Sequence, residues 1–372
     1  MRKIVFLTGT RADFGKIKAL IQSVENHSDF MPFIFVTGMH LLEEYGYTLI
    51  EVERCGFKNI STFHNHTDEA TMDLTLAKTI NGFSNYIKDI QPDLIVVHGD
   101  RVEALAGAIV GSLNNILVAH IEGGELSGTI DELIRHSVSK LSHIHYTSNE
   151  EAKKRLIQMG ELEESIFTIG SPDVDIMFSD NLPNIQEVKN YYQINFENYG
   201  VAMFHPVTTE IDLIANKAEE FVEALIESEK NYVVIFPNND LGSKHILKAY
   251  KKIQNNLRFK IFPSIRFEYF LTLLKKSEFI IGNSSAGVRE APYYNVPTIN
   301  IGNRQLNRAS SSKIINVPCK KSEILEAFSY LSNTSDETIN VFGKGNSAKL
   351  FLDSLTSSKV WSINHQKQFK DA

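Results

Sequence analysis

Residues 279–290, FIIGNSSAGVRE, run from an apolar strand through a turn of small residues into the start of a helix. Small residues let the backbone approach a ligand, and the free N–H groups at a helix start suit a phosphate. A comparable turn lies near the other end of the chain, where an apolar strand at 3–7 meets TGTRADFGK at 8–16. Two such turns, far apart in the sequence, predict one phosphate-bearing ligand held between two domains.

Short apolar runs rich in Val, Ile and Phe recur along the chain, each followed by a helical pattern. Because these runs are continuous instead of alternating, we expect strands buried on both faces, as in a parallel sheet between helix layers. The sequence therefore predicts an α/β fold with two doubly wound, Rossmann-like sheets. The predicted strands are 4–7, 33–37, 94–97, 117–121, 144–147, 166–169, 201–204, 232–236, 259–262, 279–281, 298–301 and 314–317.

At 372 residues the chain is too long for one hydrophobic core and suits two domains. The stretch 177–199 interrupts the alternation because it is polar and has a single helix-like piece at 185–192. We place the junction there. The predicted domains are an N-terminal domain at 1–178, a C-terminal domain at 179–345, and a helical tail at 346–372 that packs back on the N-terminal domain.

Composition narrows the class of protein. The net charge of −7 argues against a nucleic-acid partner, since binding to phosphate backbones needs a basic surface. Cys55 and Cys319 are the two cysteines, too few for a disulfide framework or a zinc site. The apolar run after Met1 is too short for a signal peptide or a membrane span, so we expect a cytoplasmic protein. A phosphate would then need a local basic pocket, for which the candidates are Arg11, Lys16, Arg266, Arg304 and Arg308.

Acidic residues follow the predicted strands of the first half. Ligands of open parallel sheets bind at the carboxyl ends of strands, so this is where chemistry is expected. Asp100 lies in HGDR at 98–101, and Glu122 lies in HIEGGE at 120–125. Asp131 opens a predicted helix at 130–141, with Arg135 one turn further on. In the second half, His205 and Asn239 follow strands in the same way.

Each of these residues also has a structural explanation. Aspartate is a favoured helix N-cap, so Asp100 fits a cap. Asp131 and Arg135 fit a surface pair four residues apart, worth about 0.2 to 0.5 kcal/mol. His205 fits a buried core histidine, whereas Arg11 and Lys16 fit solvated surface charges. Three carboxylates also resemble a metal site, but without HxxH or HExxH spacing we predict no metal.

Seven motifs, in order along almost the whole chain, make the interpretation specific. The sequence resembles the hydrolysing UDP-N-acetylglucosamine 2-epimerases of bacterial sialic acid pathways. This resemblance implies a two-domain fold of the glycosyltransferase-B type with its active site in the interdomain cleft. It also implies conversion of UDP-N-acetylglucosamine and water into N-acetylmannosamine and UDP, without a metal or nicotinamide cofactor. The motifs are GTRADFGK at 9, HGDR at 98, HIEGGELSGT at 120, DELIRHSVSKLSHIH at 131, FHPVTTE at 204, PNND at 237 and IGNSSAGVREAP at 281.

The resemblance assigns roles to residues of these motifs. It implies catalytic roles for Asp100, Glu122 and Asp131, with His205 and Arg135 as their active-site partners. The nucleotide sugar is the expected partner, bound by a homo-oligomer that is a dimer or a tetramer. The residues implied to bind UDP are Arg11, Lys16, Asn239, Arg266, Ser284, Ser285, Gly287, Glu290 and Arg304.

Three alternatives stay open at this point. The related non-hydrolysing epimerases, which release UDP-N-acetylmannosamine, have a Glu where Asp131 stands and an arginine-rich run where FHPVTT stands. The shorter Asp131 leaves space for a water at C1 of the sugar. A glycosyltransferase with the same fold would need an acceptor. A 4-acetamido-6-deoxy relative of the substrate, UDP-2,4-diacetamido-2,4,6-trideoxyglucose, differs by only a few contacts.

Overall fold

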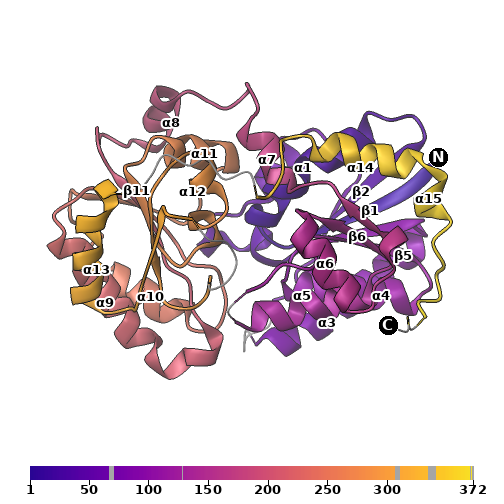
Figure 1. Ribbon diagram of the computed structural model, residues 1–372, viewed down its shortest axis with the longest axis horizontal. Helices are drawn as coiled ribbons and strands as arrows, with labels where there is room; N and C mark the ends of the chain where they lie inside the picture. Colours follow the sequence, from indigo (N-terminus) through magenta and orange to yellow (C-terminus); the bar gives the residue numbers. More distant parts are fainter. Residues whose placement is uncertain (67–70, 128, 306–310, 334–340, 369, 371–372) are drawn as a thin grey trace. The chain divides into compact units, whose positions relative to one another are not determined.

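The computed structural model describes residues 1–66, 71–127, 129–305, 311–333, 341–368 and 370. The chain divides into two compact units (Figure 1). The first consists of Met1–Glu125, Asp131–Ser179 and Val341–Ala372, and the second of Leu126–Ile130 and Asp180–Asn340.

The first unit contains a seven-stranded sheet in the described part of the chain, with the order β3-β2-β1-β4-β5-β6-β7. All neighbouring strands are parallel. The central strands β4 and β5 are buried along their whole length, as continuous apolar runs predict. The strands are β1 (Arg2–Thr8), β2 (Phe30–Val36), β3 (Ile60–Thr62), β4 (Leu94–His98), β5 (Leu117–Ile121), β6 (Ile144–Thr147) and β7 (Ile166–Thr168).

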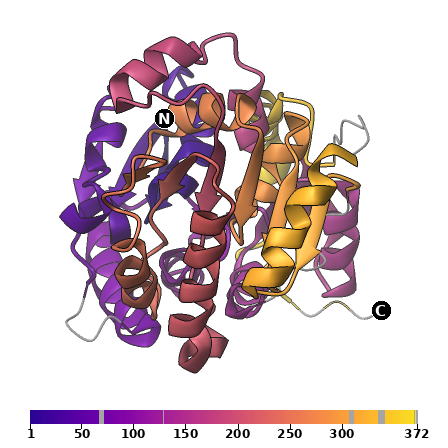
Figure 2. The ribbon, with the colours of Figure 1, turned by 90° about the vertical axis from the view of Figure 1, so that its left-hand side faces the viewer.

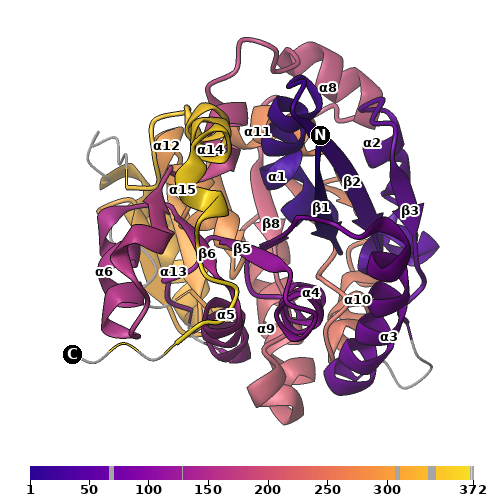
Figure 3. The same ribbon diagram turned by 90° about the vertical axis from the view of Figure 1, so that its right-hand side faces the viewer.

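Helices cover both faces of this sheet (Figure 3). One layer is formed by α1 (Arg11–Glu25), α7 (Pro172–Met177) and α14 (Ser347–Thr356), which pack against one another. The other layer contains α3 (Met72–Ile90), α4 (Val102–Leu113) and α5 (Ile130–Leu141). Shorter elements are η1 (Gly38–Leu41), η2 (Glu43–Tyr45), α2 (Leu49–Glu53), α6 (Glu150–Gln158), η3 (Glu163–Ser165) and α15 (Ser358–Trp361).

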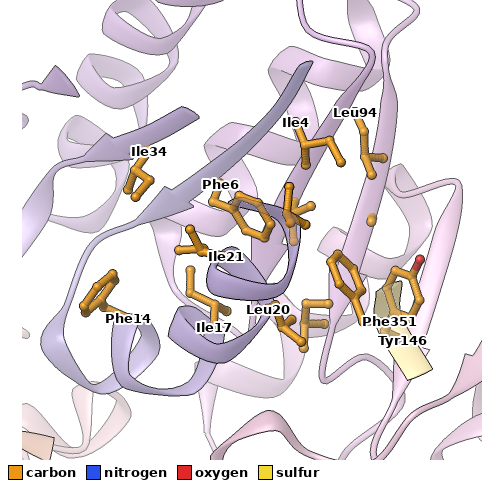
Figure 4. Packing of buried hydrophobic residues seen from close by; sticks show 14 of the residues in the cluster. Ile4, Phe6, Phe14, Ile17, Leu20, Ile21, Ile34, Leu94, Tyr146 and Phe351 are labelled. Carbon is orange, nitrogen blue, oxygen red and sulfur yellow. The ribbon is translucent and has the colours of Figure 1, made fainter. Parts of the chain in front are cut away.

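The C-terminal tail contributes to the core of the first unit. On α1, Ile17, Leu20 and Ile21 recur at helical spacing and face the sheet (Figure 4). Phe351 of α14 lies in the same cluster, with its ring centroid 6.3 Å from that of Phe6 and 4.9 Å from that of Tyr146. Helix α14 therefore completes the hydrophobic core beside α1.

The second unit contains a six-stranded parallel sheet among its described residues, with the order β10-β9-β8-β11-β12-β13 (Figure 2). Its strands are β8 (Gly200–Met203), β9 (Tyr232–Ile235), β10 (Phe259–Phe262), β11 (Phe279–Gly282), β12 (Thr298–Ile301) and β13 (Ile314–Val317). One group of helices that pack together is α9 (Ile214–Glu227), α10 (Ser243–Tyr250) and α13 (Lys321–Ala327), and the other is α8 (Ile185–Tyr192), α11 (Phe267–Lys275) and α12 (Glu290–Tyr293). The 3-10 turns are η4 (Thr208–Leu213), η5 (Ser285–Gly287) and η6 (Phe328–Asn333).

The prediction of an α/β fold with two doubly wound sheets is confirmed. The division between the units falls after Ser179, whereas the sequence suggests a boundary after residue 178. Residues 341–345 group with the first unit instead of the second. There the N–H of Ser171 donates to the carbonyl of Phe342 at 2.6 Å, and Gly343 packs closely on Gly170. Within the described ranges, the helices include none with the length and apolar character needed to cross a membrane.

Candidate active site

The carboxyl ends of β4 and β5 bring three of the predicted residues together. Arg135, fully buried on α5, donates through Nη1 to the carbonyl of Glu122 at 2.9 Å and to its Oε2 at 3.2 Å. Its Nη2 donates to a carboxylate oxygen of Asp100. The guanidinium thus compensates two carboxylates that lie at adjacent strand ends. Because Arg135 is buried, the interpretation of Asp131 and Arg135 as a surface pair is wrong.

Local backbone geometry explains how these side chains meet. Strands β4 and β5 pair with His98 opposite Ile121, so Asp100 and Glu122 follow at the same edge of the sheet. Glu122 has a positive φ of 73°, a conformation that L-residues rarely adopt and that often marks a functional constraint. The N-cap of α4 is Arg101, so the interpretation of Asp100 as that cap is wrong.

Lys16 belongs to the same carboxylate cluster. Its Nζ is buried and lies 3.0 Å from Oε1 of Glu122 and 4.0 Å from Oδ2 of Asp173. Nε2 of His98 lies 3.9 Å from Oε2 of Glu122. The interpretation of Lys16 as a solvated surface charge is therefore wrong. Asp173, which follows β7 in the first turn of α7, was not among the predicted residues, although its strand-end position is the signal that identifies Asp100.

The turn at 8–16 differs from the predicted phosphate loop. Asp13 accepts hydrogen bonds from the N–H groups of Gly9 at 3.0 Å and Thr10 at 3.1 Å, and from the hydroxyl of Thr8. The N–H groups of Gly9 and Thr10 therefore already have an internal acceptor, and phosphate binding by the rest of this turn stays a prediction. Burial raises the pKa of Asp13 to about 6. The Thr10-x-x-Asp13 capping box was the sequence signal for this arrangement. Arg11, which begins α1, is half-buried.

Hydrogen bonds of His120 connect the segment after β4 with helix α5, which carries Arg135. A carbonyl can only accept, so Nε2 of His120 donates to the carbonyl of Gly99 at 2.8 Å. Its Nδ1 then accepts from the hydroxyl of Ser139 on α5 at 3.0 Å. Burial lowers the pKa of His120 to about 3, which keeps the ring neutral. Asp131 lies in the first turn of α5 and is half-buried.

In the second unit, the stretch after β11 forms the predicted turn into a helix. Ser284 caps η5, its Oγ accepting from the N–H of Ala286 at 3.3 Å, and Ser285 begins that turn. Glu290, buried, begins α12. A Cβ on Gly287 would lie 2.7 Å from Cγ2 of Thr298, so this glycine is also required by packing.

His205 lies at the carboxyl end of β8 with a defined ring state. The N–H of Asn238 donates to Nδ1 of His205 at 3.0 Å, so the neutral ring carries its proton on Nε2. The side chain is half-buried, so the interpretation as a buried core histidine is wrong. Asn239, the next residue after Asn238, is half-buried as well.

The two predicted arginines of this unit occupy different surroundings. Nη1 of Arg304 donates to the carbonyl of Asn283 at 3.4 Å, which places it beside the 284–287 turn. The guanidinium of Arg266 lies over the ring of Tyr269, 4.7 Å from its centroid. Arg308 lies outside the described residues. Within those residues, no cluster of three or more His, Cys, Asp or Glu side chains is arranged to hold a metal ion.

Comparisons with known proteins identify the family of this chain. The family description "UDP-N-acetylglucosamine 2-epimerase" matches residues 22–356. A UDP-N-acetylglucosamine 2-epimerase of Neisseria meningitidis serogroup B is 47% identical over 375 residues, covering 100% of this chain and 99% of the relative. Polysialic acid biosynthesis protein P7 of Escherichia coli is 35% identical, covering 87% of this chain and 85% of the relative. The UDP-N,N'-diacetylbacillosamine 2-epimerase (hydrolyzing) of Legionella pneumophila is 32% identical, covering 94% of each.

Among solved structures, the UDP-GlcNAc 2-epimerase of Methanocaldococcus jannaschii in complex with UDP-GlcNAc and UDP superimposes with a TM-score of 0.83. It is 24% identical and covers 96% of this chain and 99% of the other, so the likeness concerns the fold. The family match over most of the chain and the relatives at 32% identity or more lead to one conclusion. This chain belongs to the UDP-N-acetylglucosamine 2-epimerase family.

Proposed function

We propose that this enzyme converts UDP-N-acetylglucosamine and water into N-acetylmannosamine and UDP, for the synthesis of sialic acid. The observation that carries the proposal is the cluster of buried Glu122 and half-buried Asp100 around Arg135, with Lys16 also contacting Glu122. Carboxylates held in place by fixed cations are suited to moving a proton at carbon. The choice of sugar is supported by the 47% identity to the relative that is named for this substrate.

The first proposed step is an elimination. The hydrogen at C2 of the sugar is weakly acidic, so its removal must be coupled to departure of UDP from C1. A carboxylate of the cluster takes the C2 proton, the C1–O bond to UDP breaks, and a C1=C2 double bond forms. The products are 2-acetamidoglucal and UDP. We assign this proton transfer to the group Asp100, Glu122 and Asp131, without dividing the two faces of C2 among them.

The second unit supplies most of the proposed UDP-binding residues. Arg304 brings a positive charge beside Ser284 and Ser285, which suits the diphosphate that carries the leaving charge. Glu290 at the start of α12 offers a carboxylate for the ribose hydroxyls. The proposed set is completed by Asn239, Arg266 and Gly287 of this unit and by Arg11 and Lys16 of the first unit. His205 is proposed to act on the reacting sugar nucleotide through Nε2–H.

The second proposed step is hydration. Water adds its hydroxyl to C1 of the glucal, and a proton returns to C2 from the face opposite to the one that lost it. The net result is inversion at C2 and release of N-acetylmannosamine. One observation supports hydrolysis: the relative at 32% identity carries "hydrolyzing" in its name. We also infer, from side-chain length alone, that Asp131 leaves more room for a water than the Glu of the non-hydrolysing epimerases would.

A second candidate substrate is UDP-N,N'-diacetylbacillosamine, which is UDP-2,4-diacetamido-2,4,6-trideoxyglucose. It is favoured by two relatives at 32% and 34% identity that are named for this sugar. Both candidates require the same bonds to break and form, so the carboxylate cluster serves either one. The difference lies in the groups at C4 and C6.

Incubation with each nucleotide sugar separately, followed by phosphorus and proton NMR, tests the proposal. We expect free UDP and N-acetylmannosamine from UDP-N-acetylglucosamine in buffer alone, with a higher kcat/KM than for the diacetamido sugar. Accumulation of UDP-N-acetylmannosamine as the final product would instead identify a non-hydrolysing epimerase. Turnover only after addition of an acceptor sugar would identify a glycosyltransferase.

A further inference from the structure

Asn283 makes an unusual set of contacts at the end of β11. Its side chain is 1% exposed. Oδ1 accepts from the N–H of His205 at 2.6 Å, and Nδ2 donates to the carbonyl of His205 at 2.9 Å. One side-chain amide therefore satisfies both main-chain hydrogen-bonding groups of a single residue on another strand end.

This contact continues the sheet beyond its last backbone pair. Strands β8 and β11 are parallel and end with Gly282 opposite Met203. The N–H of Asn283 still donates to the carbonyl of Met203 at 3.1 Å, and the side-chain amide then pairs with His205 as a backbone amide would. The two strands are tightly apposed here, since a Cβ on Gly282 would lie 1.9 Å from the carbonyl oxygen of Met203. These contacts fix the backbone of His205, two residues after the end of β8, relative to the end of β11.

The main chain of Asn283 faces the proposed nucleotide-binding residues. Its carbonyl accepts from Nε2 of Gln305 at 3.1 Å and from Nη1 of Arg304 at 3.4 Å. Ser284 follows directly in the chain. Asn283 thus contacts His205 through its side chain and Arg304 through its carbonyl. A substitution of the side chain removes the atoms that contact His205 and keeps the carbonyl that contacts Arg304.

We propose that Asn283 is a positioning residue that holds His205 in its reactive place, an inference that rests on the proposed function for the role of His205. An amide is required because one atom must accept and the other must donate. Aspartate has the same shape but, when ionised, cannot donate to the carbonyl of His205. The ring of His205 accepts from the N–H of Asn238, whereas Asn283 contacts only the backbone of His205, so Asn283 acts on the ring through the position of that backbone.

Steady-state kinetics of Asn283→Asp test this role, with Asn300→Asp as the matched control. Asn300 is also 1% exposed and lies on the neighbouring strand β12, where its Nδ2 donates to Oδ1 of Asn316 at 2.8 Å. We expect Asn283→Asp to lower kcat at least about tenfold with KM changed less than about threefold, since a contact made only around the reacting group affects kcat. Asn300→Asp should lower the melting temperature to a similar extent and leave kcat nearly unchanged.

A double-mutant cycle with His205→Gln separates positioning from a general loss of stability. If Asn283 acts through His205, the double variant should be no slower than His205→Gln alone. If the reductions in kcat caused by the two substitutions multiply in the double variant, the inference is overturned.

Nitrogen-15 NMR of histidine-labelled protein without substrate gives a readout that does not depend on turnover. The signals of His205, identified by their loss in His205→Gln, should show protonated Nε2 in the wild type and should shift in Asn283→Asp but not in Asn300→Asp. Unchanged His205 signals in Asn283→Asp would also overturn the inference. Absence of sugar product from the wild type would contradict the proposed function and leave this NMR result intact.

Discussion

Arg135 is one buried side chain that compensates the negative charge of two carboxylates. It donates to Glu122 and Asp100 from a fully buried position, so its removal would leave two acids with less compensation in a poorly solvated place. Its planar fork reaches both acids at once, a geometry that a lysine ammonium cannot reproduce. The arginine therefore serves stability and chemistry together.

We expect Arg135→Met to destabilise the protein by about 3 to 5 kcal/mol, because it breaks a buried ion pair by removing one partner. Arg135→Lys should recover part of this stability while kcat stays at least about tenfold below the wild type, since one of the two contacts is lost. Denaturant unfolding and steady-state kinetics provide the two measurements. Arg54→Met is the control, because Arg54 forms an exposed pair with Glu51. Equal stability losses at the two arginines would contradict the central place given to Arg135.

The sequence can identify candidate functional residues that directly follow a predicted strand. Strand-end position marks Asp100, Glu122 and His205 as candidates, and the family resemblance implies their roles. The structure brings the first two together at Arg135. Lys16 was predicted, but its pairing with Glu122 joins residues that are distant in the chain, and no local pattern reports such a contact. The capping box of Thr10 and Asp13 is a local pattern, yet the prediction for the turn at 8–16 does not include the hydrogen bonds that Asp13 accepts from Gly9 and Thr10.

At the scale of elements, the length of an apolar run decides which strands the sequence can predict. All twelve predicted strands exist, because each is an apolar run long enough to stand out from its flanks. Strand β3 was not predicted, since Ile60–Thr62 has only three residues and Ile60 is its one apolar residue. The tail was recognised as helical from its spacing, but its place beside α1 depends on the shape of a core that periodicity does not describe.

The α14 contact predicts a large effect from a single substitution near the C-terminus. Phe351 is fully buried between Phe6 and Tyr146, so Phe351→Ala would leave a cavity in the core of the first unit. We expect a loss of about 3 to 5 kcal/mol in unfolding free energy. Leu257→Ala, at a side chain that is 92% exposed, should change the stability by less than about 0.5 kcal/mol. A loss below about 1 kcal/mol for Phe351→Ala would contradict the packing described for α14.

At the scale of the whole molecule, buried histidines make stability depend on pH. Burial lowers the pKa of His40 and of His120 to about 3, below the ordinary value of 6.5. For a base with a lowered folded pKa, the contribution to stability is fully present above pH 6.5 and is lost as the pH falls towards 3. Asp13 acts in the opposite direction, because its pKa is raised from 3.8 to about 6 and its contribution falls as the pH rises between those values.

His120→Gln isolates one of these contributions. The stability difference between wild type and variant should grow as the pH rises from 4 to 6.5, by at most about 1.4 kcal/mol per pH unit, because one proton is involved. Urea unfolding at several pH values measures it. The exposed His64→Gln controls for the loss of a surface histidine. A difference that is the same at pH 4 and pH 7 would show that His120 is not kept neutral by burial.

The complete reaction makes a final prediction, because elimination and hydration leave isotopic signatures that other routes do not. If the C2 proton is lost to a carboxylate and a second proton returns from the opposite face, turnover in deuterium oxide should place one deuterium at C2 of N-acetylmannosamine. Water labelled with oxygen-18 should enter the sugar at C1, since the C1–O bond breaks, whereas attack at phosphorus would label UDP.

The amide variants Asp100→Asn, Glu122→Gln and Asp131→Asn keep the shape and remove the base, so each should lower kcat by about 100-fold or more. A variant blocked only in hydration should release 2-acetamidoglucal. Protium at C2 after turnover in deuterium oxide would contradict proton exchange with solvent. Near-normal rates in all three amide variants would rule out Asp100, Glu122 and Asp131 as the groups that transfer the proton.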